Sequence, residues 1–475
     1  MVVLNWYCDG FVAIITSLNL IDMSITEQIV PPGPAGKYDP ADNILDWLMT
    51  NLKEYGGVYR ALMYGAYVYV VSDPRHVDHI MRENWQNYRK GPAIKRVGML
   101  LGNGLMVSEG EFWKTQRRLI QPAFHGEAVS KLVALIGKTS VDLLSRWMTL
   151  AQQERSINVT RDVSVWVLEV VLRGIFSHDF DTVAPAFSVI SSESARNLQF
   201  AQAFRPLREV VREVIGRRRQ TAEGETDILG MLMGARDRAT GETMPEGQLV
   251  SEVVTLIVAG HETTASTLSW VWYLLSQHPT VESRLSSELQ TCSGASATDP
   301  LAGVPYLRQI IDEAMRLYPP GWLMTRRAIN DDRIGDYFVP AGTEVYISPY
   351  LIHRNPAHWK HPEVFDPDRF APGQIPGGHP LAHIPFSAGP RKCIGDMLAR
   401  LEMHIHIATV VPYLRLCWTS GNPDELETGV NLRCRNDLHF TAGIKAPLSL
   451  GRAAVTHTER PSFPAPHACS AVRTV

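Results

Sequence analysis

The spacing of apolar residues separates a long helical part of the chain from a more mixed C-terminal part. From about 110 to 280 the apolar positions recur mostly at helical intervals, and another such pattern runs from Asp396 to His406. After Pro319, short β-prone pieces such as 344–347 alternate with proline-rich loops, and 67–71 is a similar piece near the N-terminus. The pattern predicts a mainly α-helical fold with small β-sheets.

The longest apolar stretch, Leu249–Leu275, is long enough to cross a membrane, which takes roughly 20 apolar residues. It nevertheless contains Glu252, His261 and Glu262, and ionisable side chains are costly inside a bilayer. We therefore expect a long helix through the middle of a large soluble protein.

The N-terminal segment has no clear transmembrane anchor. Phe11–Ile21 is apolar but short, Asn19 interrupts it, and neither a basic run nor an A-x-A cleavage site accompanies it. We interpret 1–30 as a flexible leader, with Met23 as an alternative start to Met1.

The composition is that of one large globular domain. The 475 residues are 45% hydrophobic and 20% charged, and no linker or repeat divides them. We assign the domain to 31–442 and expect the polar, proline-containing 443–475 to be a disordered tail. The net charge of −3 gives no general attraction to nucleic acid. Six scattered cysteines without zinc-ligand spacing favour a reducing compartment, so we expect a cytoplasmic protein.

The most informative segment is 385–395, with the sequence PFSAGPRKCIG, which directly precedes the helical pattern at Asp396. This order places the sulfur of Cys393 near a helix N-terminus, where backbone N–H groups and the helix dipole favour a thiolate. Arg391 and Lys392 add positive charge, and two glycines allow tight turns and close approach of a planar ring. An isolated cysteine would more often be a small buried residue, but here the whole pattern F-x-x-G-x-R-x-C-x-G is present.

That pattern resembles the haem-binding loop of the cytochrome P-450 family. The resemblance implies that Cys393 is the axial thiolate ligand of a haem b iron, that Phe386 packs against the ligand loop, and that Arg391 pairs with a haem propionate. A thiolate ligand pushes electron density toward the iron and favours O–O cleavage.

A second motif, Ala259–Thr264 with the sequence AGHETT, lies midway along the long apolar stretch. Glycine inside a helix costs about 1 kcal/mol relative to alanine, so we expect the small residues to let a flat ligand and O₂ approach the backbone. A solvated glutamate and a helix-bonded threonine are the simpler interpretation, and a zinc helix is excluded because Ala265 stands where H-E-x-x-H needs histidine. The segment resembles the A-G-x-[DE]-T motif of P-450 proteins, which implies that Glu262 and Thr263 form the acid–alcohol pair supplying protons for O₂ activation.

Further motifs of the family bind the cofactor or support the fold. Trp113 and Arg117 match its W-x-x-x-R helix, which implies contacts with haem propionates, although Trp and Arg one turn apart can also be a packed helix. Arg326 occupies the position of another propionate-binding cation, with Arg327 as a near competitor.

Glu313 and Arg316 match the E-x-x-R signature, whose partner in a later loop is Arg369 here. Without the resemblance, the first two residues could be a surface ion pair of little energetic value. We expect the three to form a folding network and to take no part in catalysis.

Together these motifs cover roughly residues 31–440 in the order of the family, so the chain is similar to a soluble, bacterial-like P-450 monooxygenase. We expect it to hydroxylate or epoxidise a lipophilic terpenoid, steroid or fatty acid with O₂. Other oxidations such as phenol coupling or desaturation remain alternatives, and so does a haem-based ligand binder, which Glu262 and Thr263 disfavour. The expected pocket is mostly apolar, with linings at Gly321–Leu323, Val258–Ala259, the 91–108 loop and helices around 188–215.

Electrons are expected from a separate ferredoxin- or flavodoxin-type protein, because no flavin or nicotinamide domain is evident. Basic residues gather on the predicted thiolate side, where an acidic partner would dock: Lys114, Arg117, Arg118, Arg391 and Lys392. If the haem occupies Arg117 and Arg391, only an ordinary basic surface remains.

Overall fold

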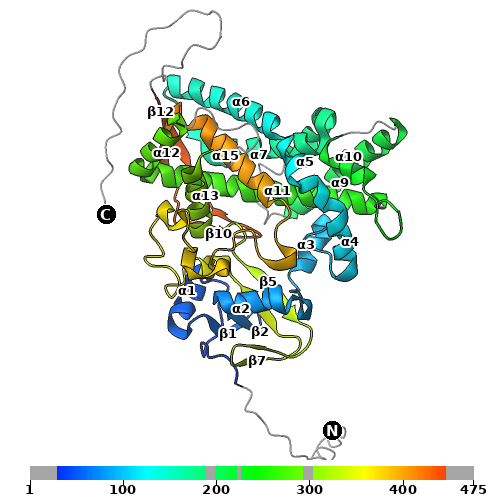
Figure 1. The fold of residues 1–475 in the computed structure, drawn as a ribbon, viewed down its shortest axis with the longest axis vertical. Coiled ribbons are helices and arrows are strands. Elements are labelled where there is room, and N and C mark those ends of the chain that lie inside the picture. Colours follow the sequence, from blue (N-terminus) through cyan, green and yellow to red (C-terminus); the bar gives the residue numbers. More distant parts are fainter. Residues whose placement is uncertain (1–28, 189–197, 222–225, 292–302, 446–475) are drawn as a thin grey trace, which may run out of the picture.

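The computed structural model describes residues 29–188, 198–221, 226–291 and 303–445. Figure 1 shows a helical part that contains α6, α7, α11 and α15, and a smaller part at the opposite end that contains the main β-sheet. The helices of the described residues are α1 (Ile44–Tyr55), α2 (Pro74–Asp78), α3 (Ile94–Leu101), α4 (Gly110–Ile120), α5 (Gly126–Ser130), α6 (Val133–Gln152), α7 (Val159–Phe176), α8 (Phe180–Phe187), α9 (Leu198–Thr221), α10 (Ile228–Gly234), α11 (Glu246–Gln277), α12 (Pro279–Thr291), α13 (Pro305–Leu317), α14 (Pro349–Ile352) and α15 (Asp396–Val410).

The strands form small sheets, as the alternating pattern predicted. The largest has the order β1-β2-β8-β5-β3, in which β2 and β8 are parallel and the other pairs are antiparallel. A second sheet has the order β4-β12-β9, and β6-β7 and β10-β11 are hairpins. The bounds are β1 (Val58–Met63), β2 (Ala66–Val71), β3 (Tyr88–Lys90), β4 (Ile157–Asn158), β5 (Met324–Ala328), β6 (Asp332–Ile334), β7 (Tyr337–Val339), β8 (Glu344–Ile347), β9 (Leu414–Ser420), β10 (Leu426–Thr428), β11 (Leu432–Cys434) and β12 (His439–Ile444).

The long apolar stretch forms helix α11, which has 32 residues and packs against α7, α9, α13 and α15. Its surroundings explain why it is apolar on nearly every face, since a helix surrounded by other helices has little contact with water. Across the described ranges, no helix combines the length and the hydrophobicity that a membrane crossing requires.

Helices α6, α7, α11 and α15 meet around the buried imidazole of His406. The indole Nε1 of Trp272 donates to His406 Nε2 at 3.1 Å, and the rings of Trp166 and Trp147 lie 4.7 and 5.8 Å from the imidazole. Burial lowers the pKa of His406 to about 3, so the ring stays neutral and can accept the indole proton.

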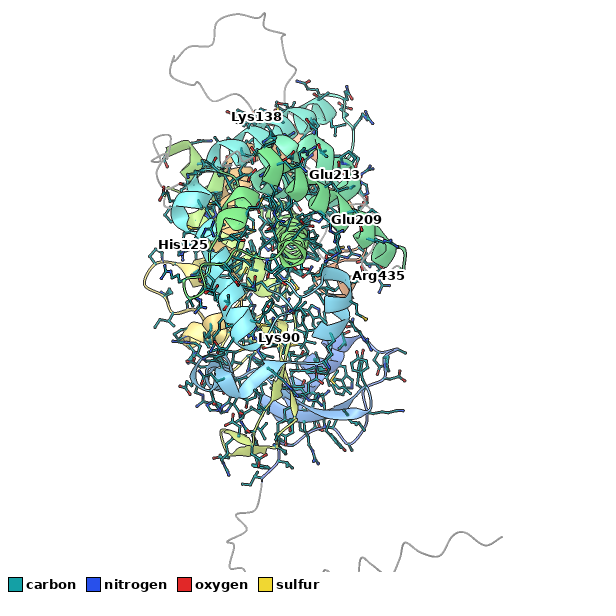
Figure 2. The ribbon with its side chains drawn as sticks, turned by 90° about the vertical axis from the view of Figure 1, so that its right-hand side faces the viewer. Lys90, His125, Lys138, Glu209, Glu213 and Arg435 are labelled. Atoms are coloured by element: carbon teal, nitrogen blue, oxygen red, sulfur yellow. The ribbon has the colours of Figure 1, made fainter. Side chains whose placement is uncertain are left out.

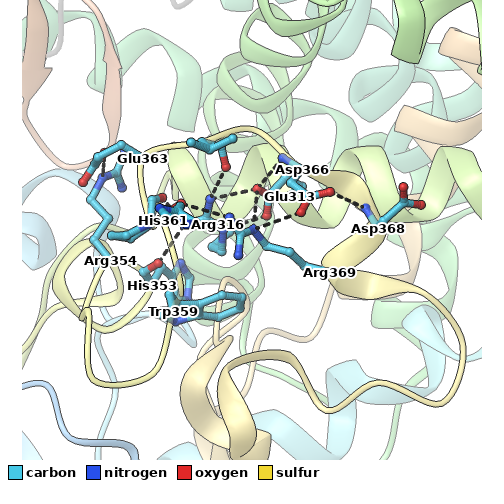
Figure 3. A network of polar contacts seen from close by, with 12 residues as sticks. Glu313, Arg316, His353, Arg354, Trp359, His361, Glu363, Asp366, Asp368 and Arg369 are labelled. Atoms are coloured by element: carbon cyan, nitrogen blue, oxygen red, sulfur yellow. Dashed lines mark hydrogen bonds and ion pairs between the residues drawn. The ribbon is translucent and has the colours of Figure 1, made fainter.

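The predicted folding network is present at the end of α13 (Figure 3). Arg316 and Glu313 are fully buried and joined by two hydrogen bonds of 2.6 and 2.8 Å. Arg316 also donates to the carbonyls of His353 and Pro362, and Arg369 Nε lies 3.5 Å from Glu313 Oε1. Burial raises the pKa of Glu313, which the neighbouring Arg316 opposes. The network fixes the loops between β8 and α15 against α13.

Two segment boundaries differ from those expected. The segment 91–108, expected to be a loop, contains helix α3 because Ile94, Val97 and Leu101 supply apolar positions at helical spacing. At the C-terminal end, β12 continues through Ile444, where the ordered domain was expected to stop at 442. Residues 1–28 and 446–475, which include most of the predicted leader and tail, lie outside the described residues.

Candidate active site

The backbone of the cysteine loop is shaped by two residues with positive φ, Ser387 and Gly389. A Cβ at Gly389 would lie only 1.9 Å from the carbonyl oxygen of Met81, so glycine is needed there. The N–H of Cys393 donates to the carbonyl of Phe386 at 2.9 Å and closes the loop just before α15 begins. The ring of Phe386 packs against the main core and lies 5.0 Å from the guanidinium carbon of Arg400.

The thiol of Cys393 is accessible to water although protein surrounds it. Its residue surface is exposed, yet burial is the largest influence on the thiol and raises its pKa. The N–H of Gly395 and the cations of Arg117 and Lys392 oppose this rise with smaller effects. An accessible group inside protein indicates an internal recess. Without a metal, burial therefore outweighs the helix terminus and the nearby cations, and a bound metal would favour the deprotonated sulfur.

Helix α4 lies directly against this loop. Arg117 Nη1 donates to the carbonyl of Lys392 at 2.8 Å, and Arg117 is close enough to Cys393 for a mutual electrostatic effect. Trp113 is buried, and the guanidinium carbon of Arg391 lies 4.1 Å from the centre of its ring. The tertiary structure thus brings Trp113, Arg117, Arg391 and Cys393 together from two distant parts of the chain.

Positive charge gathers beside the loop with little compensating negative charge. Arg391 pairs with Glu109 and donates to the carbonyl of Ser108 at 3.2 Å. Arg326 is buried and lines the same small cavity as Arg391, and burial lowers its pKa to about 10, with Arg391 adding to the effect. Within the described ranges, no carboxylate forms an ion pair with Arg326, whose Nη1 donates to the carbonyl of Thr325 at 2.9 Å. The neighbouring Arg327 donates outward to Gly342, so Arg326 is the inward-facing member of the two candidates.

Lys90 is a further buried cation in this region, which sequence reasoning missed. It lies between the main sheet and the helices (Figure 2) and donates to the carbonyls of Leu105, Met106 and Ser108. Burial lowers its pKa to about 7, and Arg391 adds to that effect. Lys90, Arg326 and Arg391 thus bring three basic side chains close to Glu109.

Between its two accessible ends, helix α11 is accessible only in its middle. Val258–Gly260 and Glu262–Thr263 are half-buried, whereas 249–257 and 264–272 are fully buried on either side. Accessible positions in the centre of a buried helix indicate an internal space along that stretch. A Cβ added to Gly260 would lie 3.5 Å from Val171 of α7, so a side chain at this position would face the neighbouring helix.

The acid and the alcohol of the second motif have separate partners. The hydroxyl of Thr263 donates to the carbonyl of Ala259 at 2.8 Å, as its position in the helix allows. The carboxylate of Glu262 accepts from Asn431 Nδ2 at 2.9 Å and from Arg433 Nη1 at 3.3 Å. These partners belong to the β10–β11 hairpin, and no local signal in the sequence pointed to them.

The other ionisable residues of the apolar stretch have structural contacts. Glu252 accepts from the N–H of Leu105 at 2.7 Å and from Gln248 at 2.6 Å, and burial raises its pKa to about 7. His261 Nε2 lies 2.9 Å from the hydroxyl of Ser164, so it belongs to the contact between α11 and α7. Neither residue needs a metal to explain its position.

Trp322 was expected to line the pocket but is buried in a side cluster of the core. Its Nε1 donates to the carbonyl of Gly429 at 3.2 Å, so it supports the β10–β11 hairpin. Leu323 and Gly321 beside it are half-buried. The helices predicted around 188–215 are described only in part, as α9.

The basic surface predicted for a redox partner is less positive than expected. Lys114 pairs with Glu111 at 2.6 Å, Arg118 with Asp237 at 3.6 Å, and Lys392 with Asp396 at 2.5 Å. Arg117 and Arg391 are turned toward the cysteine loop and Glu109. The free positive charge of this face is therefore reduced by neighbouring carboxylates.

The loop that carries Cys393 thus packs against Trp113 and Arg117 of α4, and the buried cation Arg326 lies on the same side. Residues 32–190 and 184–433 match the family model described as Cytochrome P450. The chain is 32% identical over 391 residues to "Cyclooctat-9-en-7-ol 5-monooxygenase" of Streptomyces melanosporofaciens, which covers 78% of this chain and 84% of that protein. It is 28% identical over 436 residues to "Carotene epsilon-monooxygenase, chloroplastic" of Arabidopsis thaliana, covering 82% and 80%.

Among solved structures, the fold is similar to retinoic acid bound cyanobacterial CYP120A1, with a TM-score of 0.76 and 23% identity over 88% of this chain and all of that one. The chain therefore belongs to the cytochrome P450 family. It is a P450 monooxygenase with the mainly helical fold that the sequence predicted, and membership of the family implies a haem-thiolate cofactor.

Proposed function

We propose that this enzyme binds haem b through Cys393 and uses O₂ to hydroxylate or epoxidise a lipophilic small molecule such as a terpenoid, steroid or fatty acid. The observation that carries the proposal is the accessible Cys393 thiol inside the protein, beside cations that exceed the nearby carboxylates. When bound, the haem supplies O₂ activation and the oxidation of an unactivated C–H or C=C bond.

The residues around the recess would hold this group by charge and packing. Arg326 and Arg391 would neutralise the propionates, because desolvated cations gain most from an anionic partner. Arg117 and Trp113 hold α4 against the cysteine loop and complete the same side of the site. Phe386 packs under the loop that carries the sulfur.

Glu262 and Thr263 relay the protons that O₂ reduction consumes. The hydroxyl of Thr263 holds a proton within the accessible stretch of α11, and Glu262 beside it can take up a proton from water and pass it on. The back-bond to Ala259 keeps the hydroxyl in place between turnovers.

The apolar character of the accessible stretch supports a lipophilic substrate. Val258, Ala259 and Leu323 are half-buried and bear no polar side chain. The names of two relatives mention a carotene and cyclooctat-9-en-7-ol, both rich in hydrocarbon. The test is a substrate library screened for the blue shift of the Soret band, followed by turnover under ¹⁸O₂. Incorporation of one ¹⁸O atom into the product is expected, and an oxidised product without label would contradict the proposal.

We propose a separate ferredoxin- or flavodoxin-type protein as electron donor and the cytoplasm as the location. Arg118 and Lys392 are more than half exposed on the face that carries the cysteine loop, which supports docking of an acidic partner despite their ion pairs. Charge reversal at both positions should slow reduction and weaken its salt dependence. An unchanged rate and an unchanged salt dependence would exclude docking at this face.

A further inference from the structure

Both oxygens of the Glu262 carboxylate are engaged by the β10–β11 hairpin, which follows the cysteine loop in the sequence. Asn431 Nδ2 donates to Oε2 at 2.9 Å, and Arg433 Nη1 donates to Oε1 at 3.3 Å. The hydroxyl of Thr263 meanwhile donates to Ala259 within α11. In this arrangement the acid contacts the hairpin, and the alcohol contacts its own helix.

Arg433 contacts two carboxylates, those of Glu427 and Glu262, and its contact with Glu262 is the longer one. The guanidinium Nε and Nη2 each lie 2.9 Å from Glu427 Oε2, both closer than the contact with Glu262. The Glu427 side chain is 10% exposed, whereas that of Glu262 is 26% exposed. When Glu262 leaves, Arg433 keeps its more buried partner, so the departure avoids the large cost of an unpaired buried charge.

The hairpin itself is firmly attached to its surroundings. The N–H of Leu432 donates to the carbonyl of Pro320 at 2.8 Å, and Ser266 of α11 donates to the carbonyl of Leu432 at 2.9 Å. Trp322 donates to the carbonyl of Gly429 at the turn. The backbone that carries Asn431 and Arg433 is therefore held in place, and the side chain of Glu262 is the part that can move.

We propose that Asn431 and Arg433 are positioning residues that hold Glu262 where it takes up protons, and that Glu262 must leave the hairpin to reach Thr263. Arg433 is 29% exposed, so water can reach this end of the path. A proton from water neutralises the carboxylate and weakens its attraction to the guanidinium. The acid then gives that proton to the Thr263 oxygen, Thr263 passes its own hydroxyl proton to the oxygen being reduced, and the carboxylate returns to Arg433.

This inference rests on the proposed monooxygenase function and adds the path by which its protons arrive. The test uses the holoenzyme with Arg433→Met, Arg433→Lys and Asn431→Ala, and Arg435→Met as the matched control. Arg435 lies two residues along the same segment, is exposed, and sits at the edge of the molecule (Figure 2). Product formed per O₂ consumed, hydrogen peroxide released and the solvent isotope effect are measured for each variant.

Arg433→Met should lower product per O₂ by about tenfold or more, with hydrogen peroxide making up the difference, and should raise the solvent isotope effect. Asn431→Ala should have a smaller effect in the same direction, Arg433→Lys should recover part of the coupling, and Arg435→Met should match the wild type. The inference would be overturned if Arg433→Met and Asn431→Ala left product per O₂ and the solvent isotope effect unchanged. It would also be overturned if Arg435→Met changed both quantities equally.

A readout independent of turnover is the melting temperature of the ferric, substrate-free holoenzyme. If the Glu262–Arg433 contact exists in solution, Arg433→Met should lower the melting temperature by about 2 °C more in the wild-type background than in Glu262→Gln. If Arg433→Met lowers the melting temperature equally in both backgrounds, the Glu262–Arg433 contact on which the inference rests does not exist in solution. A wild-type enzyme that oxidises no substrate with any surrogate reductase would instead count against the proposed function, and the thermal cycle would still decide the contact.

Discussion

The guanidinium carbon of Arg391 lies 4.1 Å from the ring centre of Trp113, so the cysteine loop rests on helix α4 through a cation–π contact. Such a contact is worth about 0.5–2 kcal/mol, more where water is excluded, and Trp113 is buried. It joins two residues that lie almost three hundred positions apart in the sequence.

Replacing Trp113 with leucine should weaken haem retention, because the loop that carries Cys393 loses its support and Arg391 loses its orientation. We expect haem affinity to fall by up to about tenfold, since 1.4 kcal/mol corresponds to a factor of ten. Haem transfer to apomyoglobin measures the loss. The control is Phe112→Leu, which changes the exposed neighbour on the same helix and should retain haem as the wild type does.

Cys393→Ser should abolish the red-shifted, thiolate-type Soret band of the reduced CO complex, because serine provides no thiolate for the iron. Cys434→Ser is the matched control, since Cys434 is also a free thiol but lies in β11. The assignment of Cys393 would be wrong if the serine variant kept the red-shifted band, or if Cys434→Ser lost it.

Glu402→Gln should flatten the pH dependence of stability. Burial on α15 raises the pKa of Glu402 from 4.5 to about 8, against a smaller opposing effect of Thr264. Between pH 4.5 and 8 the folded protein therefore keeps a proton that the unfolded chain releases, so stability falls as the pH rises, by at most about 1.4 kcal/mol per pH unit.

Relative to the wild type, Glu402→Gln should thus become more stable from pH 5 to pH 8, as melting temperatures of the ferric holoenzyme will show. Glu111→Gln replaces a carboxylate whose side chain is 84% exposed. Its melting temperature should therefore change with pH in parallel with that of the wild type. A constant difference between Glu402→Gln and wild type across this range would contradict the prediction.

Arg316→Met should destabilise the protein by about 3–5 kcal/mol, because it leaves the carboxylate of Glu313 buried without its main partner. Arg284→Met breaks a pair with Asp368 in which both side chains are more than half exposed, and should cost no more than about 1 kcal/mol. Urea unfolding of both variants gives the comparison. Equal losses would show that burial does not set the strength of the Glu313–Arg316 pair.

The sequence alone determined the fold class and predicted the residues of the site, because both depend on local order. Apolar spacing placed α11 and α15 within a few residues of their observed bounds, and Glu344–Ile347 became strand β8 as predicted. The cysteine loop could be recognised because its turns and glycines lie within eleven consecutive residues, directly before α15 begins at Asp396. Arg326 faces inward and Arg327 outward, which strand alternation could distinguish only once the buried face was known.

Only the tertiary structure decided which distant groups meet. Asn431 and Arg433 reach Glu262 across some 170 positions, and Lys90 and Glu109 join Arg391 across almost three hundred, so no local pattern could indicate either contact. The direction of the pKa shift at Cys393 also depends on the tertiary structure, because burial, which the whole surrounding chain sets, outweighs the nearby cations. The order of residues decides which chemical groups a segment carries. Packing decides which residues those groups contact and how far they are exposed to water.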